Sequence, residues 1–333
     1  MIIIKSNSND PSYNLALEEY IFEYMSQDED YFWLWQNQDA VIIGKHQNTA
    51  QEINKAYTEN NNIKVVRRLS GGGAVFHDMG NVNFTFITNV GDLQKINMKM
   101  FCMPVIKTLK GIGVEAELNG RNDMTIDGKK FSGNAQYIKK GRIMHHGCIM
   151  FDSNVSILEK ALNVPKDKYE SKGFKSVKSR VTNIKPHLPA DLFDLSSEEF
   201  KILLENQIKF LHGDTQIYNL NKDDEKIVER IKKERYDTWE WNYGRSPMFS
   251  VSKRRKVEDV GTIEMHLNVE DGIISDYMSY GDYFGEGSNE SLKELLIGCK
   301  LKKDSLMEAL QGFSIELCYN NLKKEAFVDL LLS

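Results

Sequence analysis

The sequence predicts an α+β fold, in which a mixed β-sheet is combined with helices, followed by a smaller α+β unit. Short apolar runs bounded by turn residues predict the strands, and apolar residues at helical spacing predict the helices. The chain has 333 residues, more than the size at which a single hydrophobic core usually stops growing. We therefore expect a large domain at residues 1–245 and a small domain at residues 247–333.

In the large domain the first helix is predicted to begin at Asp10, a capping carboxylate that Pro11 follows. Its buried face is predicted from four apolar residues at helical spacing, Leu17, Ile21, Tyr24 and Met25. Strands are expected at residues 1–5, 31–35, 41–43, 63–68, 82–87, 114–118, 123–126, 137–138 and 143–151. Further helices are expected at residues 98–109, 156–162, 197–211 and 222–235.

In the small domain, which follows a break at Ser246-Pro247, strands and helices are again mixed. The strands are expected at residues 249–251, 262–268 and 273–279. The helices are expected at residues 291–296, 304–310 and 323–332.

Composition excludes two classes of partner. Hydrophobic residues make up 41% and charged residues 27% of the chain, which is typical of globular proteins. The formal net charge of −5 gives no general attraction to nucleic acid or to anionic membranes. No apolar run approaches the roughly 20 residues that a membrane-spanning helix needs. We therefore expect no nucleic acid and no membrane as a partner.

The cysteines indicate the compartment. Cys102, Cys148, Cys299 and Cys318 are scattered, without any Cys-x-x-Cys pair. This spacing is not that of a zinc site or of a disulfide framework. Free cysteines are typical of a reducing environment, so we expect a cytoplasmic protein.

The most informative stretch is the glycine-rich segment at residues 70–81, between two predicted strands. Its three consecutive glycines, Gly71 to Gly73, allow positive φ and let the backbone lie against a ligand with its N–H groups turned inward. Arg67 and Arg68 precede it, and only one of them can face the same cleft because side chains alternate along a strand. A flexible hairpin is the alternative, but the flanking charged and polar residues favour an anion-binding loop.

A second stretch brings a lysine beside a polar loop. Asp127-Gly128 predicts a two-residue hairpin turn, which returns Lys130 toward residues 119–123. Lys129 and Lys130 point to opposite faces of their strand, so one of them is a surface lysine. The small residues Ser132-Gly133 next to Lys130 would allow a ligand to approach closely.

Together these stretches resemble the lipoate–protein ligase family, of the lipoate-protein ligase A type with a C-terminal accessory domain. The matching segments are Arg68, residues 70–78, Gly80-Asn81, residues 120–123, Lys130, Ser132-Gly133, residues 145–147, residues 179–183 and residues 239–242. The resemblance covers most of residues 1–245, and beyond residue 247 it is one of position and size. It implies a biotin/lipoate ligase-like catalytic domain followed by a small accessory domain.

The resemblance implies a two-step reaction. Lipoate and ATP first give lipoyl-adenylate and pyrophosphate, and the lipoyl group then passes to a lysine of an acceptor, which releases AMP. The implied acceptors are lipoyl domains of the E2 subunits of 2-oxoacid dehydrogenases and the glycine cleavage H protein, and we expect a monomer. Mg²⁺ is implied between the phosphate oxygens. Because an alkyl tail can be recognised only by apolar burial, we also expect octanoate to be accepted.

The resemblance also assigns site residues. It implies that Lys130 is catalytic and contacts both substrates. The residues implied for ATP are Arg68, Gly73, Ala74, Val75, Phe76, Asn122, Asp123, Lys130 and Arg180. Those implied for (R)-lipoate are Ser70, Gly71, Gly72, His77 and Lys130. Asp123 is the implied carboxylate ligand of Mg²⁺.

Several assignments stay open at this point. Val75, Phe76 and Phe84 are either walls of the lipoate pocket or ordinary core. His145 and His146 alternate across a strand, so one of them faces the cleft. The basic residues 166–180 form a solvated face or, by the resemblance, a loop that orders over the adenylate.

Other functions remain as alternatives. An octanoyl or lipoyl transferase would act without ATP through a cysteine thioester, for which Cys148 is the candidate nucleophile. A second alternative transfers only pre-formed lipoyl-adenylate. The remaining ones are a non-enzymatic nucleotide or nucleic-acid binder and a biotin ligase.

Overall fold

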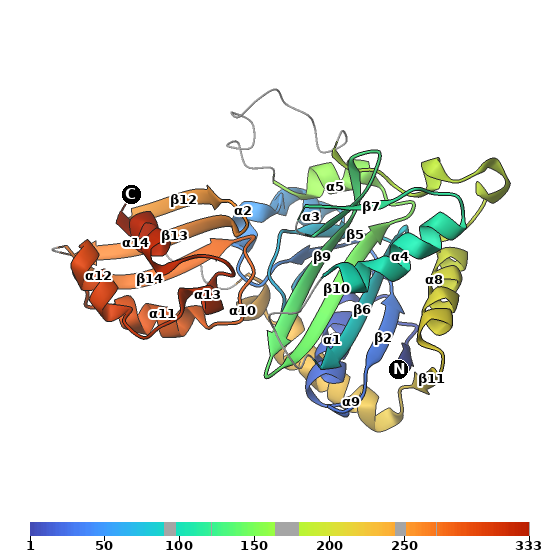
Figure 1. Cartoon of the computed structure of the whole chain (residues 1–333), viewed down its shortest axis with the longest axis horizontal. Helices are drawn as coiled ribbons and strands as arrows, with labels where there is room; N and C mark the ends of the chain where they lie inside the picture. The colour runs from blue at the N-terminus through green and yellow to red at the C-terminus, as the bar shows by residue number, and fades with distance from the viewer. Residues whose placement is uncertain (90–97, 121, 164–179, 244–250, 271, 333) are drawn as a thin grey trace. The chain divides into compact units, whose positions relative to one another are not determined.

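An eight-stranded mixed sheet organises the larger of two units in the computed structural model (Figure 1). The structure describes residues 1–89, 98–120, 122–163, 180–243, 251–270 and 272–332. The first unit comprises Met1–Ile43, Ala50–Arg68 and Ala74–Asn242, and the second comprises Gly44–Thr49, Leu69–Gly73 and Tyr243–Ser333. Two short loops from the N-terminal half therefore belong to the same unit as the C-terminal residues.

The large sheet has the strand order β11-β1-β2-β6-β10-β9-β8-β7. β1 runs parallel to both of its neighbours, and every other pair is antiparallel. The strands are β1 (Ile2–Lys5), β2 (Tyr31–Trp35), β6 (Asn81–Asn89), β7 (Glu117–Asn119), β8 (Asp123–Ile126), β9 (Lys129–Lys139), β10 (Arg142–Met150) and β11 (Gln216–Asn219). The mixture of sheets and helices confirms the predicted α+β class.

A smaller three-stranded sheet includes a strand within the predicted glycine-rich segment, so the loop itself is shorter than residues 70–81. Its strands are β3 (Ala40–Ile43), β4 (Lys64–Arg67) and β5 (Val75–His77). β3 pairs with β4 in parallel and with β5 in antiparallel fashion. The segment between β4 and β5 therefore starts and ends at one small sheet.

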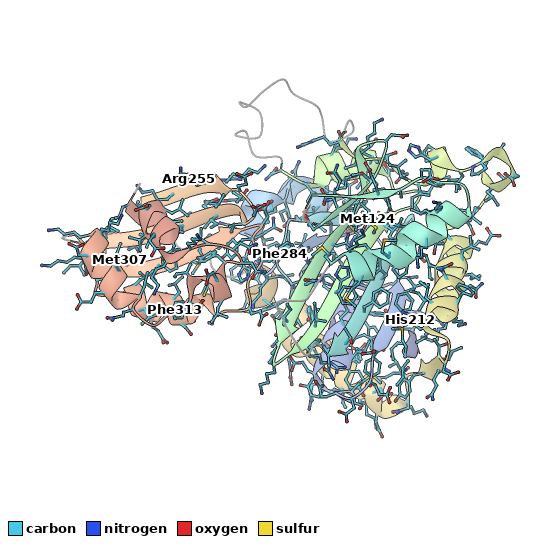
Figure 2. All side chains as sticks on the ribbon, in the orientation of Figure 1. Met124, His212, Arg255, Phe284, Met307 and Phe313 are labelled. Carbon is cyan, nitrogen blue, oxygen red and sulfur yellow. The ribbon has the colours of Figure 1, made fainter. Side chains whose placement is uncertain are left out.

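Helices cover the large sheet of the first unit. α4 (Lys99–Gly111) and α8 (Ser197–His212) contribute to one apolar core with β6, β8, β9 and β10 (Figure 1). The other described helices are α1 (Pro11–Glu23), α2 (Thr49–Glu52), α3 (Lys55–Asn60), α5 (Val155–Ala161), η2 (Lys185–His187), η3 (Ala190–Leu192), α9 (Lys222–Ile231), η4 (Lys232–Tyr236) and α10 (Trp239–Asn242). Met124 of β8 is fully buried in this core (Figure 2).

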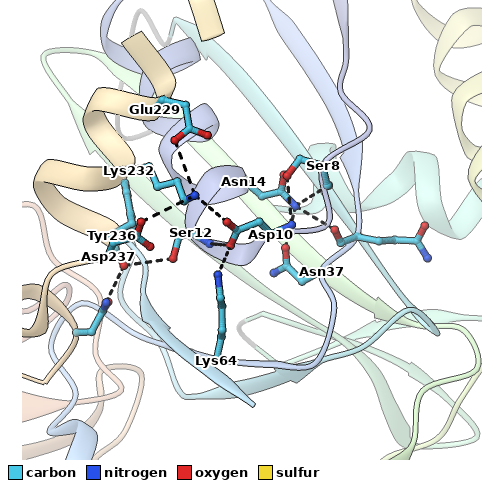
Figure 3. Close-up of polar contacts among 12 residues, drawn as sticks. Ser8, Asp10, Ser12, Asn14, Asn37, Lys64, Glu229, Lys232, Tyr236 and Asp237 are labelled. Carbon is cyan, nitrogen blue, oxygen red and sulfur yellow. Dashed lines mark hydrogen bonds and ion pairs between the residues drawn. The ribbon is translucent and has the colours of Figure 1, made fainter. Parts of the chain in front are cut away.

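α1 begins where the sequence predicts. Asp10 is its N-cap and accepts a hydrogen bond from the backbone N–H of Ser12 at 3.1 Å. The same carboxylate makes ion pairs with Lys64 at 2.8 Å and Lys232 at 3.0 Å (Figure 3). These contacts tie the start of the helix to β4 and to η4.

The predicted buried face of α1 is wrong at its C-terminal end. Tyr24 is 53% exposed, because the helix ends at Glu23 and Tyr24 is its C-cap. Leu17 and Ile21 are buried as predicted. The helix is in fact buried on nearly all sides from Pro11 to Phe22, so that Glu18 and Glu19 lie in the interior.

The predicted hairpin turn at Asp127-Gly128 is confirmed, and a second hairpin turn lies at Lys140-Gly141. Asp127 and Gly128 have φ values of 51° and 72°, and Lys140 and Gly141 have 51° and 76°. Positive φ at both central residues is the requirement of the two-residue type I′ turn. The first turn joins β8 to β9, the strand that carries Lys130.

The second unit has its own sheet and core. The strands β12 (Val251–Val257), β13 (Gly261–Glu270) and β14 (Ile273–Gly281) form an antiparallel sheet. Its helices are α11 (Asn289–Leu296), α12 (Lys303–Ala309), α13 (Ile315–Cys318) and α14 (Lys324–Leu332). Fully buried residues of these elements, such as Leu267, Leu292 and Phe327, form one apolar cluster.

Candidate active site

A β-bulge places Lys130 on the same face of the sheet as Asp123 and Gly133. The register between β8 and β9 shifts between Met124 and Thr125, so that Thr125 pairs with Lys130 and Asp123 pairs with Gly133. A bulge adds one residue to one strand and turns the following side chains to the other face. Lys130 and Gly133 therefore share a face although three positions separate them.

The ammonium group of Lys130 lies against this face. Its Nζ is 2.7 Å from Oδ1 of Asp123, and the side chain is 37% exposed. A Cβ added at Gly133 would lie 3.0 Å from the Nζ atom, so that a larger residue at this position would displace the lysine. Lys129, in contrast, is exposed.

The residues after the basic segment anchor the strand of Lys130. Val181 forms a parallel bridge with Lys130, and the backbone N–H of Thr182 donates to the carbonyl oxygen of Lys130 at 2.9 Å. The part of the basic segment at residues 166–179, with its predicted loop, lies outside the described residues. Arg180, the first residue described after it, is exposed.

A row of paired residues extends this face across the large sheet. Gly133 pairs with Asp123 on one side and with Cys148 on the other, and Cys148 pairs in turn with Asn83, which pairs with Trp35. Directly opposite residues on neighbouring strands share a face. Cys148 and Trp35 therefore lie on the face that carries Lys130.

His146 lies on this face as well, which decides between the two neighbouring histidines. Its Nδ1 is 3.0 Å and 3.1 Å from the two carboxylate oxygens of Glu18. Thr85, which pairs with His146 across the strands, donates to the same carboxylate and accepts a hydrogen bond from Nε1 of Trp35 at 2.9 Å. Glu18, Thr85, Trp35 and His146 thus form a buried polar network.

His145 points to the opposite face, into the core under α4. Its ring stacks on Phe101 with centroids 4.6 Å apart and contacts Phe84 at 5.8 Å. Burial lowers the pKa of His145 well below its usual value. Phe84 belongs to the same core cluster, so it is a core residue rather than a wall on the Lys130 face.

Arg67 and Arg68 donate hydrogen bonds to different parts of the chain. Nε of Arg67 donates to the carbonyl oxygen of Trp241 at 2.8 Å, and Nη2 donates to that of Asn242 at 3.3 Å. Nη1 of Arg68 donates to the carbonyl oxygen of Ile42 at 3.1 Å. Arg67 therefore anchors α10 to β4.

Arg68 is buried close to the Lys130 face. Burial lowers its pKa to about 10, while the nearby Cys148 and Glu18 raise it. The guanidinium therefore stays charged at neutral pH. A buried cation with its charge retained is suited to hold an anionic ligand.

His77 is neutral and has a free ring nitrogen. Burial, with the nearby Arg68 and His146, lowers its pKa to about 3. Nδ2 of Asn37 donates to its Nδ1 at 3.1 Å, because Oδ1 of Asn37 accepts from Asn14. The proton of His77 therefore sits on Nε2, which has no hydrogen-bond partner among the described residues.

The next residue, Asp78, stabilises the turn that follows β5. Its carboxylate accepts hydrogen bonds from the backbone N–H groups of Gly80 at 2.9 Å and Asn154 at 2.7 Å. Asp78 is thus a structural residue of this turn. Of His77 and Asp78, only His77 has an N–H group that could donate to a ligand.

The neutrality of His77 predicts a pH dependence of stability. The folded state holds His77 unprotonated below its usual pKa of 6.5, whereas the unfolded chain takes up the proton. The free energy of unfolding should therefore fall by up to about 1.4 kcal/mol per pH unit for each such histidine as the pH drops below about 6.5. Urea unfolding of the parent and His77→Phe between about pH 6.5 and 5 checks this, and equal slopes would contradict it.

The glycine loop, Leu69–Gly73, belongs to the second unit. Ser70 is buried, and its carbonyl oxygen accepts a hydrogen bond from the backbone N–H of Lys45 at 2.8 Å. Gly72 has a φ of 89°, a conformation that favours glycine. Its N–H donates to the carbonyl oxygen of Tyr283 at 3.4 Å.

Sequence reasoning missed the buried network around Glu18. A signal was present, since Leu15, Ile21 and Phe22, which lie one helical turn from Glu18, are apolar. A carboxylate at a buried position requires partners, because an unpaired buried charge is costly. Which residues supply those partners depends on strand pairing, which the sequence does not specify.

Within the described residues, no group of three histidine, cysteine, aspartate or glutamate side chains could hold a metal ion. Asp123, beside Lys130, belongs to no such group. One carboxylate together with substrate phosphates is a usual arrangement for Mg²⁺.

The chain matches two family models. Residues 10–209 match the lipoyl protein ligase A/B catalytic domain, and residues 246–331 match the bacterial lipoate protein ligase C-terminus. The chain is also 45% identical over 333 residues to lipoate-protein ligase LplJ of Bacillus subtilis, with 99% of each chain covered. No helix in the described ranges has the length and apolar character to cross a membrane.

Solved structures show the same fold. LipL1 of P. falciparum, in complex with lipoate, has a TM-score of 0.80 at 24% identity, covering 100% of this chain and 98% of that one. The bipartite lipoate protein ligase of Thermoplasma acidophilum, studied with its E2 lipoyl domain, has 0.65 at 26%, covering 75% and 98%. A lipoate-protein ligase A bound with ATP has 0.62 at 24%, covering 73% and 98%. By family model, sequence identity and fold, the chain belongs to the lipoate–protein ligase family.

Proposed function

We propose that this protein activates lipoate with ATP to lipoyl-adenylate and transfers the lipoyl group to a lysine of a lipoyl domain. The observation that carries this proposal is the position of the Lys130 ammonium, beside Asp123 and over Gly133, on the face next to the buried Arg68. Family membership supports the same reaction. ATP is the co-substrate that a carboxylate needs to become an acyl donor.

In the activation step the lipoate carboxylate attacks the α-phosphorus of ATP, and pyrophosphate leaves. Negative charge accumulates on the non-bridging oxygens of the α-phosphate. Lys130 would exchange its ion pair with Asp123 for these oxygens and for the attacking carboxylate. A preorganised donor of this kind contributes about 3 kcal/mol or more to the transition state.

Residues around Lys130 would bind the nucleotide. Arg68 supplies a charged donor next to this face, and the backbone at residues 73–76 leads from the glycine loop into β5. Asn122 is held by Asn134, whose backbone N–H donates to the carbonyl oxygen of Asn122 at 3.0 Å. We propose that Asn122, Asp123 and Arg180 contact ATP, the last from the end of the basic segment.

We propose Asp123 as the protein ligand of Mg²⁺. The ion would neutralise phosphate charge and orient the leaving pyrophosphate. The chain itself contributes one carboxylate there, so that most ligands would come from ATP and water. The ion pair of Asp123 with Lys130 would open when the nucleotide binds.

The apolar tail of lipoate would lie against Val75, Phe76 and Trp35. Trp35 lies on the Lys130 face, and Phe76 is buried in the small sheet. Nε2 of His77 is a buried donor on the same strand as Phe76. We propose that Ser70, Gly71 and Gly72 contact the lipoate carboxylate. A pocket built on apolar burial rejects octanoate weakly, so octanoate is also a substrate in this proposal.

The acceptor would be a lipoyl domain, whose lysine attacks the lipoyl carbonyl and releases AMP. The T. acidophilum relative was studied with such a domain of an E2 subunit. We propose E2 subunits and the glycine cleavage H protein as acceptors, a monomeric enzyme, and a cytoplasmic location in keeping with the scattered cysteines.

Incubation with ATP, Mg²⁺, lipoate and an apo lipoyl domain tests the proposal. The intact mass of the domain should rise by one lipoyl group, and omission of ATP should abolish the increase. A domain in which the acceptor lysine is replaced by arginine is the control. No mass increase with any of the proposed acceptors would contradict the assignment.

A transferase that works through a cysteine thioester is the second candidate, because Cys148 lies on the Lys130 face. Its Sγ contacts the carbonyl oxygen of Gly133 at 3.7 Å. We expect Cys148→Ser to retain at least about half of the ATP-dependent activity, since the proposed step needs no thiol. Complete loss of activity, with an acyl-cysteine trapped in the parent protein, would favour the transferase.

A further inference from the structure

The glycine loop is in backbone contact with a second loop, residues 44–49. The N–H of Lys45 donates to the carbonyl oxygen of Ser70 at 2.8 Å. A Cβ added at Gly44 would lie 1.9 Å from the carbonyl oxygen of Gly72, so that only glycine allows this approach. The two loops therefore pack as one body within the second unit.

Both loops rest on the end of β14 and on the chain segment that follows it. The N–H of Gly281 donates to the carbonyl oxygen of His46 at 2.7 Å, and the N–H of Gly72 donates to that of Tyr283 at 3.4 Å. A Cβ added at Gly71 would lie 2.3 Å from the carbonyl oxygen of Tyr283. The absence of a side chain at Gly71 is thus needed for this packing.

Two aromatic side chains complete the contact. The rings of His46 and Tyr283 stack with centroids 4.7 Å apart and an interplanar angle of 17°. Tyr283 is fully buried, and its hydroxyl is held by Asn289 at 3.0 Å and Ser279 at 2.9 Å. The ring that His46 meets is therefore fixed by the core of the second unit.

This packing has a consequence for ligand binding. A tract of three glycines loses much conformational entropy when it becomes ordered. Packing against a fixed surface removes that cost before a ligand arrives, which favours binding. The glycine loop continues directly into Arg68 at one end and Ala74 at the other, two residues of the proposed nucleotide site.

We propose that His46 and Tyr283 are positioning residues, through which the C-terminal residues of the second unit hold the glycine loop in its ligand-binding conformation. This inference rests on the proposed function. His46 acts through the loop rather than on the reacting atoms. Loosening the loop should therefore raise the KM for lipoate and ATP in the activation step and leave kcat nearly unchanged.

Lipoate-dependent ATP–pyrophosphate exchange measures this split. His46→Ala removes the stacked ring, and Gly44→Ala forces the two loops apart. His46→Ala should raise the KM for lipoate by about threefold to tenfold, the range expected for an aromatic pair, and Gly44→Ala should raise it as well. His46→Phe keeps a ring and should restore the parent value. Gly111→Ala, where an added Cβ meets nothing within 4 Å, is the control and should behave as the parent protein.

Amide hydrogen exchange gives a readout on the loop itself. In the ligand-free parent protein the Gly72 amide should exchange more slowly than an unstructured amide, and His46→Ala should remove this protection. An unprotected Gly72 amide in the parent would overturn the inference, and so would unchanged KM values in both His46→Ala and Gly44→Ala. A parent protein without any lipoate-dependent exchange would instead contradict the proposed function.

Discussion

Replacement of Lys130 by alanine is expected to abolish formation of lipoyl-adenylate while the protein stays folded. The side chain is 37% exposed and contacts Asp123, so its loss opens no cavity in the core. In the proposed mechanism the ammonium is the donor that meets the charge on the α-phosphate. Its removal should lower kcat for activation at least about 100-fold. Single-turnover formation of the adenylate measures the effect.

Lys129→Ala is the matched control for this experiment. Lys129 is the adjacent residue of the same strand and is exposed. It should support activation at the rate of the parent protein. If the two alanine variants lose activity equally, Lys130 is not the group that acts on the phosphate. Circular dichroism of both variants shows whether the fold is retained.

Arg68→Lys is expected to lower kcat/KM for activation by about tenfold to 100-fold. Lysine retains a charge but lacks the planar fork that binds phosphate or carboxylate with two hydrogen bonds. A lost hydrogen bond to a charged group accounts for an effect of this size. Most of the loss should appear in the KM for ATP, which pyrophosphate exchange at varied ATP concentration measures.

Arg67→Lys separates the two neighbouring arginines. Arg67 donates to the carbonyl oxygens of Trp241 and Asn242, so the substitution should lower the free energy of unfolding by about 2 kcal/mol. Its KM for ATP should stay near that of the parent below the unfolding transition. A larger rise in KM for Arg67→Lys than for Arg68→Lys would show that the wrong arginine has been assigned.

Several strands and helices follow from local sequence signals, whereas β5, β11, α2 and α3 were not predicted. Asp10 with Pro11 starts α1, and Asp127-Gly128 makes the turn before β9, because capping and positive φ are properties of one or two residues. Tyr24 and Met25 are the exceptions on the predicted buried face of α1, since Tyr24 is exposed and Met25 is only half-buried. Their positions fit the helical period, but α1 ends at Glu23.

The arrangement of the site is less accessible from sequence. The bulge at Met124 and Thr125 brings Lys130 next to Gly133 and Asp123, and no local pattern indicates a bulge there. Strand pairing decides that His146 faces the Lys130 side while His145 enters the core. Pairing of this kind depends on residues far away in the chain, so the sequence alone did not show which of the two histidines faces the site.

The placement of the glycine loop also depends on distant contacts. Its glycines and the positive φ at Gly72 follow from local chemistry. Its packing against Tyr283 joins residues more than 200 positions apart. A sign of close backbone packing was nevertheless present, because a second glycine, Gly44, begins the polar loop at residues 44–49.

Lipoate-dependent exchange of labelled pyrophosphate into ATP, in the absence of any acceptor, isolates the activation step assigned to Lys130. The parent protein should incorporate label only when lipoate and Mg²⁺ are present, and Lys130→Ala should incorporate none. Absence of exchange in a parent protein that still transfers the lipoyl group from supplied lipoyl-adenylate would contradict this assignment.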